Sequence, residues 1–241
     1  MKKIIFICSL FTFTQSSLAT TFEIIREHSN VSFNVDYMTV TKVDGIFKDF
    51  YGDFNFDEIN NEISKVNVDI VAKSVDTNDG KRDFHLRGQE FFLVETNPII
   101  SFKSNAKTVF HQDGSFSLPG IIKLRGIEKA FVLNGVYKGK VKDAWGKYSY
   151  FFSLKGLIKR KEFNMTWNKL MDNGGFLLGD NVDVSINLQT QPMGEKTAFS
   201  THMIPSTKGI IERDLLRRGK IKKLSTSTDP KDHPVEIIKV R

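Results

Sequence analysis

Large apolar residues recur at every second position in one segment of this chain after another. The pattern starts with Val31, Phe33 and Val35, which alternate with polar residues. It returns in further segments, which are Ile46, Phe50, Phe54 and Phe56; Val66, Val68, Ile70 and Ala72; Ile100 and Phe102; Phe116, Leu118, Ile122 and Leu124; Phe131, Leu133 and Tyr137; Tyr148, Tyr150, Phe152, Leu154 and Ile158; and Val182, Val184, Ile186 and Leu188. The first of these segments is expected to be one strand that begins at Gly45. Since strand side chains alternate between two faces, each segment predicts a strand with one apolar face. About eight such strands predict an all-β fold, an eight-stranded antiparallel barrel whose interior can hold one small ligand.

Glycines interrupt these apolar faces at four positions, namely 52, 120, 135 and 156. A glycine on an inward face removes a side chain from the interior, or it marks a bend where the sheet coils. Both interpretations remain open from the glycines alone. The chain also carries 21 phenylalanines, which favour a large apolar interior and can line a tunnel without offering polar groups.

An elongated hydrocarbon suits such walls. Each methylene moved out of water gains about 0.8 kcal/mol, although a membrane provides nearly the same gain. The ligand-lining candidates, taken from the inward strand faces, are Phe33, Phe50, Phe54, Phe102, Phe131, Tyr150, Phe152 and Ile186.

The run of strands pauses for one short helix between Ser74 and Ser104. Thr77, Asn78 or Asp79 can cap its beginning. The helix is expected over 80–87, with Gly88 as a left-handed residue after its end. Pro98 then allows an extended restart. A helix of this length between strands is typical of a lid at one end of a barrel.

The expected lid consists of Arg82, Asp83, Phe84, His85 and Leu86, and its polar members Arg82, Asp83 and His85 are the candidate cluster for chemistry. Phe84 and Leu86 are expected to point inward. Asp83 and His85 are poorly placed as an acid–base pair, because residues two apart on a helix do not face each other. These polar side chains either fasten the lid to neighbouring loops or lie beside the headgroup of a ligand.

Composition argues against several other functions. The single cysteine, Cys8, lies in the first 19 residues, so the remaining chain has no disulfide, catalytic thiol or cysteine-ligated metal. The five histidines show no metal-ligand spacing, and neither a nucleophile elbow nor a phosphate-binding glycine loop is present. Residues 20–190 hold 22 basic and 22 acidic residues, which disfavours a nucleic-acid-binding barrel. The sequence predicts no enzyme, no metal and no cofactor.

Both ends of the chain differ from the middle. Residues 1–19 have the basic start, apolar stretch and small-residue cleavage site of a signal peptide, which predicts export from the cytoplasm. Residues 191–241 hold 11 basic and 6 acidic residues and are expected to form a basic, flexible C-terminal extension. A stretch within it, over 209–218, could form a basic amphipathic helix and make transient contact with an anionic membrane surface.

Spaced motifs resemble one known family in their order. They are Ser-Val-Asp-Thr at 74–77, Arg-Asp-x-His-Leu at 82–86, Glu-Phe-Phe at 90–92 and Asn-Pro-x-Ile-x-Phe-x-Ser at 97–104. Together they are similar to the YceI family of bacterial periplasmic proteins, and the resemblance extends over about 22–190. It implies a lipocalin-like barrel that binds a long isoprenoid chain.

Two departures from the family pattern lie near loops that could border an opening. The histidine usual after the first strand is Tyr37, and the usual Asn-Arg-x-Asp-Phe-Gly reads Lys-Arg-Lys-Glu-Phe-Asn at 159–164. Next to the second departure, Trp167 is expected to pack at the barrel end, either in the core or as a wall facing the ligand.

Taken together, the pattern and the resemblance predict a periplasmic protein that holds a polyprenyl lipid or an isoprenoid quinone in an apolar tunnel, for carriage, storage or stress protection. Two alternatives stay open. One is a filled barrel that serves as an interaction or stress-protection module. The other is an enzyme that acts on a lipid headgroup at the lid.

Overall fold

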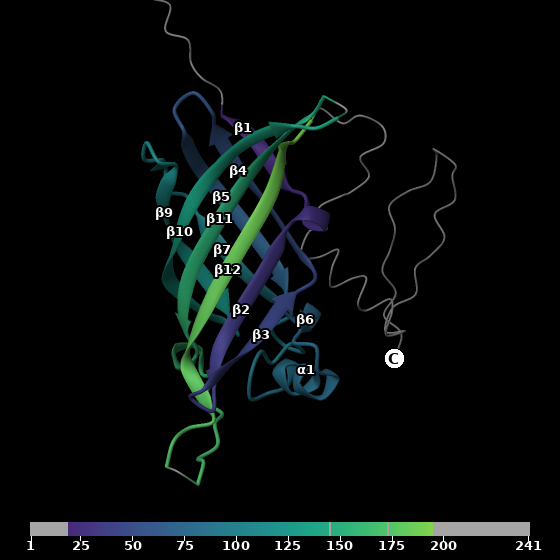
Figure 1. Ribbon diagram of the computed structural model, residues 1–241, viewed down its shortest axis with the longest axis vertical. Coiled ribbons are helices and arrows are strands. Elements are labelled where there is room, and N and C mark those ends of the chain that lie inside the picture. Colours follow the sequence, from purple (N-terminus) through teal and green to yellow (C-terminus); the bar gives the residue numbers. More distant parts are fainter. Residues whose placement is uncertain (1–18, 145, 173, 195–241) are drawn as a thin grey trace, which may run out of the picture.

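The computed structural model describes residues 19–144, 146–172 and 174–194, and these form a closed antiparallel barrel (Figure 1). The strands are β1 (Thr20–Ile24), β2 (Asn30–Tyr37), β3 (Thr41–Phe47), β4 (Phe50–Asp57), β5 (Glu62–Val71), β6 (Val75–Asp76), β7 (Ile99–Ser104), β8 (Thr108–Val109), β9 (Ser115–Leu124), β10 (Ile127–Lys142), β11 (Tyr148–Lys159) and β12 (Leu178–Pro192). The helix α1 spans Gly80–Arg87, and three short 3₁₀ turns are η1 (Arg26–His28), η2 (Ala72–Ser74) and η3 (Arg160–Phe163). The predicted helix is confirmed at both ends.

The barrel closes through eight strand positions. Its order is β1-β4-β5-β7-β9-β10-β11-β12, and β12 pairs back with β1. Beyond β12 the sheet continues through β2, β3 and β6, and β8 pairs with β5 beyond the end of β7, because four positions are each broken into two pieces. The strands β1 and β2 pair with successive parts of β12, while β3 and β4 in turn pair with β2 and β1. The predicted eight-stranded antiparallel barrel is therefore confirmed.

One of these breaks corrects the expectation of a single strand from Gly45 to Phe56. The ladder is interrupted at Lys48 and Asp49, where Lys48 N–H donates to the Ser74 carbonyl and Asp49 accepts from Val71 N–H. The interruption changes the phase of the alternation. Phe47, 8% exposed, therefore points inward, and Ile46, 36% exposed, points outward.

A two-residue hairpin turn at Arg125 and Gly126 joins β9 to β10. Arg125 and Gly126 both have a positive φ, 52° and 77°. Two positive φ values in a two-residue connection define a type I′ turn, which matches the twist of antiparallel strands. Leu124 and Ile127 pair directly on either side of it.

Glycines in the wall make room for phenylalanine rings on neighbouring strands. A Cβ atom added at Gly120 would lie 2.5 Å from Cζ of Phe102, and one at Gly135 would lie 2.3 Å from Cζ of Phe116. Gly45 with Phe33 and Gly156 with Phe131 repeat the arrangement. Each ring is thus laid against the backbone of the wall instead of projecting straight across the interior.

Candidate functional site: an apolar cavity with a polar mouth

The barrel encloses a cavity of about 550 Å³ that is lined almost entirely by apolar side chains. This volume lies within the range of roughly 300–1,000 Å³ that is common for pockets binding small molecules. The wall includes these predicted ligand-lining residues: Phe33, Phe50, Phe54, Phe102, Phe131, Phe152 and Ile186. The phenylalanines that lie over wall glycines are therefore compatible with an open interior.

Tyr150 was also predicted to line the cavity, but the structure places it outside the cavity wall. Its ring packs edge-to-face on Phe22 with centroids 4.8 Å apart, and its hydroxyl donates to Glu58 at 2.9 Å. Burial, with the neighbouring carboxylate, raises the pKa of Tyr150 to about 12, while the hydrogen bond from Lys140 lowers the pKa of Glu58. Strand alternation predicted its inward direction but not how far along the barrel the cavity extends.

An aromatic cluster limits the cavity at the end away from α1. Phe54, Phe116 and Phe152 line the cavity there. Behind them lie rings that do not reach it, such as Phe56 and Phe110, whose centroids are 6.0 Å and 6.3 Å from that of Phe152. We call the three lining rings the cavity floor. The floor and the second layer of rings fill this end of the barrel.

Polar groups gather at the opposite end of the cavity. Apart from Arg160, the charged lining residues Asp79, Lys81 and Arg82 come from the single stretch 77–85 around α1, which also contributes Thr77 and His85. Asp79 and Lys81 in this stretch are exposed, so the cavity reaches the surface there. The cavity is thus amphipathic, with an apolar interior and a polar mouth.

Hydrogen bonds fasten α1 to the strand before it. Asp79 is the N-cap, and its carboxylate accepts from the backbone N–H groups of Lys81 and Arg82, which lowers the pKa of Asp79. Arg82 donates to the hydroxyl and carbonyl oxygens of Thr77, both at 2.7 Å. Buried Asp83 accepts from the Thr77 backbone N–H at 2.8 Å and from its hydroxyl at 2.6 Å. The interpretation that Arg82 and Asp83 fasten the lid agrees with these contacts.

Two details of the predicted lid were wrong. Phe84 points away from the barrel and is 78% exposed, because the inward side of this short helix is occupied by Asp83 and Leu86. Gly88 has a φ of −74° and is extended rather than left-handed. Leu86 does line the cavity, as expected.

His85 joins α1 to the loop after η3. Its Nε2 lies 2.5 Å from a carboxylate oxygen of Glu90, and its ring meets the rings of Phe91 and Trp167 edge-to-face, each with centroids 5.0 Å apart. Trp167 lines the cavity, which is one of the two positions that the sequence left open for it. Asp83 and His85 have separate partners, so the structure does not bring them together as an acid–base pair.

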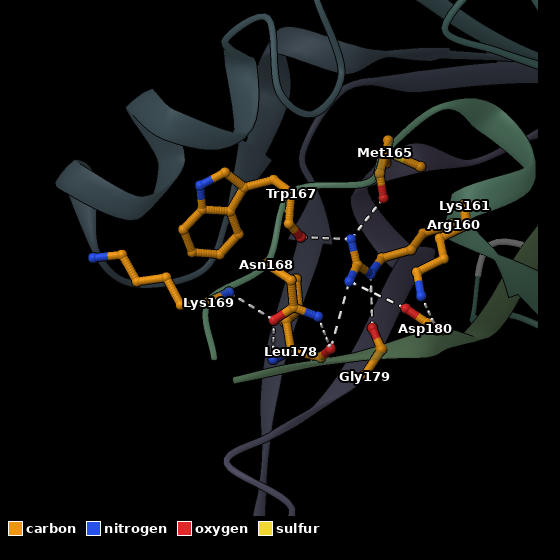
Figure 2. Close-up of polar contacts among 9 residues, drawn as sticks. All are labelled: Arg160, Lys161, Met165, Trp167, Asn168, Lys169, Leu178, Gly179 and Asp180. Atoms are coloured by element: carbon orange, nitrogen blue, oxygen red, sulfur yellow. Dashed lines mark hydrogen bonds and ion pairs between the residues drawn. The ribbon is translucent and has the colours of Figure 1, made fainter. Parts of the chain in front are cut away.

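A buried arginine organises the other side of the mouth (Figure 2). The guanidinium of Arg160 donates to the carbonyl oxygens of Met165 at 2.6 Å, Trp167 at 2.8 Å and Gly179 at 2.7 Å. It also reaches the Leu178 carbonyl and, at 3.2 Å, the Asp180 carboxylate. Burial lowers the pKa of Arg160. Sequence reasoning gave this residue no role, because its partners are backbone carbonyls that leave no residue-specific signal.

Two features are absent from residues 19–144, 146–172 and 174–194. No group of three or more histidine, cysteine, aspartate or glutamate side chains in them could hold a metal ion. No helix in them is long and apolar enough to cross a membrane. Residues 1–18 of the expected signal peptide lie outside the described part, as do 195–241 of the C-terminal extension. Residues 191 and 192 belong to β12, where Pro192 pairs with Phe22.

Comparison with known proteins places this barrel among named relatives. Protein YceI of Salmonella newport is 37% identical over 162 residues, which cover 66% of this chain and 84% of that protein. The UPF0312 protein of Photorhabdus laumondii is 37% identical over 151 residues, 62% of this chain and 78% of that protein.

Solved structures agree with the fold. The YceI protein of Campylobacter jejuni matches with a TM-score of 0.56 and 26% identity, over 67% of this chain and 90% of that chain. BcnA of Burkholderia cenocepacia matches with a TM-score of 0.59 and 20% identity, over 69% of this chain and 98% of that chain. The family model of the YceI-like domain matches residues 22–190, so this chain belongs to the YceI family.

Proposed function

We propose that this protein binds an isoprenoid-type lipid, such as a polyprenyl lipid or an isoprenoid quinone, with the hydrocarbon chain inside the barrel. The observation that carries the proposal is the cavity of about 550 Å³, whose wall is apolar except around one end. A chain threaded into such a space gains about 0.8 kcal/mol for each methylene removed from water. The polar mouth provides charged and hydrogen-bonding groups for a headgroup, and membership of the YceI family supports an isoprenoid chain.

A binding role is favoured over both alternatives. A filled barrel would have its inward side chains in mutual contact across the middle, whereas here the phenylalanines over Gly45, Gly120 and Gly156 leave the cavity open. An enzyme at the lid would need a base free to approach the headgroup. His85 is instead held between Glu90 and two rings, and Asp83 is held by Thr77.

Carriage between membranes or storage in the periplasm follows from the same proposal. The expected signal peptide at 1–19 supports a periplasmic location. A soluble carrier competes with the bilayer, which offers an equally apolar environment, so we infer that exchange with a membrane is near balance. The polar mouth can help to retain a lipid by satisfying its headgroup.

Filling the cavity tests the proposal directly. Val184 lines the cavity, and the next residue along β12, Ser185, does not. We expect Val184→Trp to occupy the lumen and to lower lipid binding, because bulk is added to existing empty space. Ser185→Trp adds the same side chain to the opposite face of the strand and should bind like the wild type.

Native mass spectrometry of gently purified protein, before and after incubation with polyprenyl lipid or quinone, provides the readout. Wild-type protein that carries no lipid and takes up none when it is added would overturn the proposal. Equal loading of Val184→Trp and wild type would also contradict it, because the lumen would then not be the binding site.

A further inference from the structure

Two phenylalanines stand apart from all the others in the described part of the chain. Of the phenylalanines there, Phe84 and Phe176 alone are exposed, at 78% and 58%, while the rest are buried or half-buried. Phe84 lies on α1, and Phe176 lies in the connection between η3 and β12. Neither lines the cavity, so neither is explained by ligand binding. Large exposed apolar side chains that gather in one place mark an interaction surface.

Further exposed apolar residues lie at the same end of the barrel. Met38 and Val40, at the turn between β2 and β3, are 43% and 86% exposed, and Leu170 is 70% exposed. Figure 1 shows α1, the β2–β3 turn and the connection before β12 together at the lower end of the molecule. We call Met38, Val40, Phe84, Leu170 and Phe176 the mouth rim.

The mouth rim is held in place by contacts between its three segments. The backbone N–H of Met38 donates to the Leu177 carbonyl at 2.8 Å, which ties the β2–β3 turn to the connection before β12. Leu170 and Phe176 form a β-bridge within that connection. The rings of His85 and Trp167 join it to α1. The exposed side chains are therefore presented by a tied framework and not by three independent loops.

The cavity reaches the surface within this framework. Its wall includes Tyr37 and Leu177, which adjoin Met38 and Phe176, and also exposed Lys81 on α1. The mouth rim thus surrounds the route by which a hydrocarbon chain would enter. Two lysines at this end are paired with carboxylates, Lys42 with Asp183 and Lys161 with Asp180. Residues 20–190 as a whole hold equal numbers of acidic and basic residues.

We infer that the mouth rim docks on a lipid bilayer by inserting its apolar side chains into the interfacial layer, so that the cavity opens directly onto the membrane. Phenylalanine and leucine are typical of interfacial segments, where the apolar body is buried at headgroup depth. The docking rests on the proposed function, because a lipid carrier has to meet the membrane that supplies its ligand. It differs from the contact expected of the basic extension at 191–241, since apolar insertion does not need anionic lipid.

Vesicle flotation with the full mature chain tests the docking. The probe is a vesicle of phosphatidylcholine alone in about 1 M salt, where the Debye length is about 3 Å and charge attraction is screened. We expect the wild type to float with these vesicles. The double variant Phe84→Ser with Phe176→Ser should lose at least about tenfold in partitioning, because it removes two apolar side chains that insert into the bilayer.

A matched control lies at the opposite end of the barrel. Ile59 and Val141 are 78% and 60% exposed, almost the same as the two phenylalanines, and they flank the ion-paired Glu58 and Lys140. The double variant Ile59→Ser with Val141→Ser should float like the wild type. Equal loss in both double variants, or a wild type that does not float, would overturn the docking. Sedimentation velocity that shows a dimer broken only by the Phe84/Phe176 variant would also overturn it, in favour of a second copy of this chain on the mouth rim.

Lipid loading separates this inference from the proposed function. Native mass spectrometry of the Phe84/Phe176 variant should show the same bound lipid as the wild type, because neither residue lines the cavity. A wild type that floats but never carries lipid would contradict the proposed function and leave the docking standing. A wild type that carries lipid but does not float would contradict the docking and leave the proposed function standing.

Discussion

At the scale of single residues, Arg160 shows how a charge can be buried without a charged partner of equal burial. Its side chain is 3% exposed, whereas that of Asp180 is 47% exposed. Four backbone carbonyls supply the remaining acceptors. The planar guanidinium has five N–H donors in a fixed fork, so it can serve acceptors that lie in different directions. This residue therefore fixes the backbone of Met165 and Trp167 against that of Leu178 and Gly179 beside the mouth.

Replacing Arg160 by lysine should cost at least about 2 kcal/mol of unfolding free energy, because several buried carbonyls lose a charged donor. Chemical denaturation provides the measurement. Lys161→Met is the matched control, since Lys161 bonds to the same Asp180 at 2.6 Å but is half exposed. That change should cost less than about 1 kcal/mol, as is usual for surface ion pairs. Equal losses in the two variants would contradict the role given to Arg160.

At the scale of elements, the sequence predicted the strands and the helix well because each has a local signal. Alternation placed the inward faces, and Asp79 could be named as one of three candidate caps because only short polar side chains reach the first free N–H groups. The direction of Phe84 and the break at Lys48 could not be predicted, since both depend on what the neighbouring element contacts. Asn164 is intermediate between these predictable and unpredictable features. It has a φ of 58° at the place where the family pattern carries glycine, and asparagine tolerates this left-handed conformation.

The pairing of glycine with phenylalanine across strands leads to a prediction for Gly135→Ala. The added methyl would lie 2.3 Å from Cζ of Phe116, so we expect a loss of about 1–3 kcal/mol from overpacking. Gly80→Ala is the control, because no atom lies within 4 Å of its added Cβ, and it should be neutral or stabilising. Adding Phe116→Leu should recover part of the loss in Gly135→Ala. If denaturation experiments show no such recovery, Gly135 must be required for the curvature of the sheet and not for the packing of the Phe116 ring.

At the scale of the whole molecule, the barrel divides into a filled half and an open half. The aromatic rings behind the floor, such as Phe56 and Phe110, are packed at the end away from α1, whereas the cavity occupies the rest and reaches the surface beside α1. Sequence alternation identifies inward residues in both halves alike, so it also predicts Tyr150 to line the cavity wall. Whether two rings contact each other depends on which residues of distant strands lie at the same height along the barrel axis. Alternation within one strand does not encode this relation.

This division implies that the cavity floor sets the longest chain that the barrel can hold. Phe152 belongs to the cavity floor and contacts the second layer of rings. Its ring centroid lies 5.1 Å from that of Tyr137 and 6.0 Å from that of Phe56. Phe152→Ala should therefore deepen the cavity and shift bound isoprenoids toward longer chains, at a cost of about 3–5 kcal/mol in stability.

A graded series of prenyl alcohols, offered as a mixture and analysed by native mass spectrometry, measures the longest chain bound. Phe163→Ala is the control, since Phe163 is equally buried at 3% exposure but does not line the cavity. It should lose similar stability with no change in chain length, because no space is added below the floor. If Phe152→Ala and the wild type select the same longest chain, the limit must lie at the mouth, where the headgroup is held, and not at the rings that close the barrel.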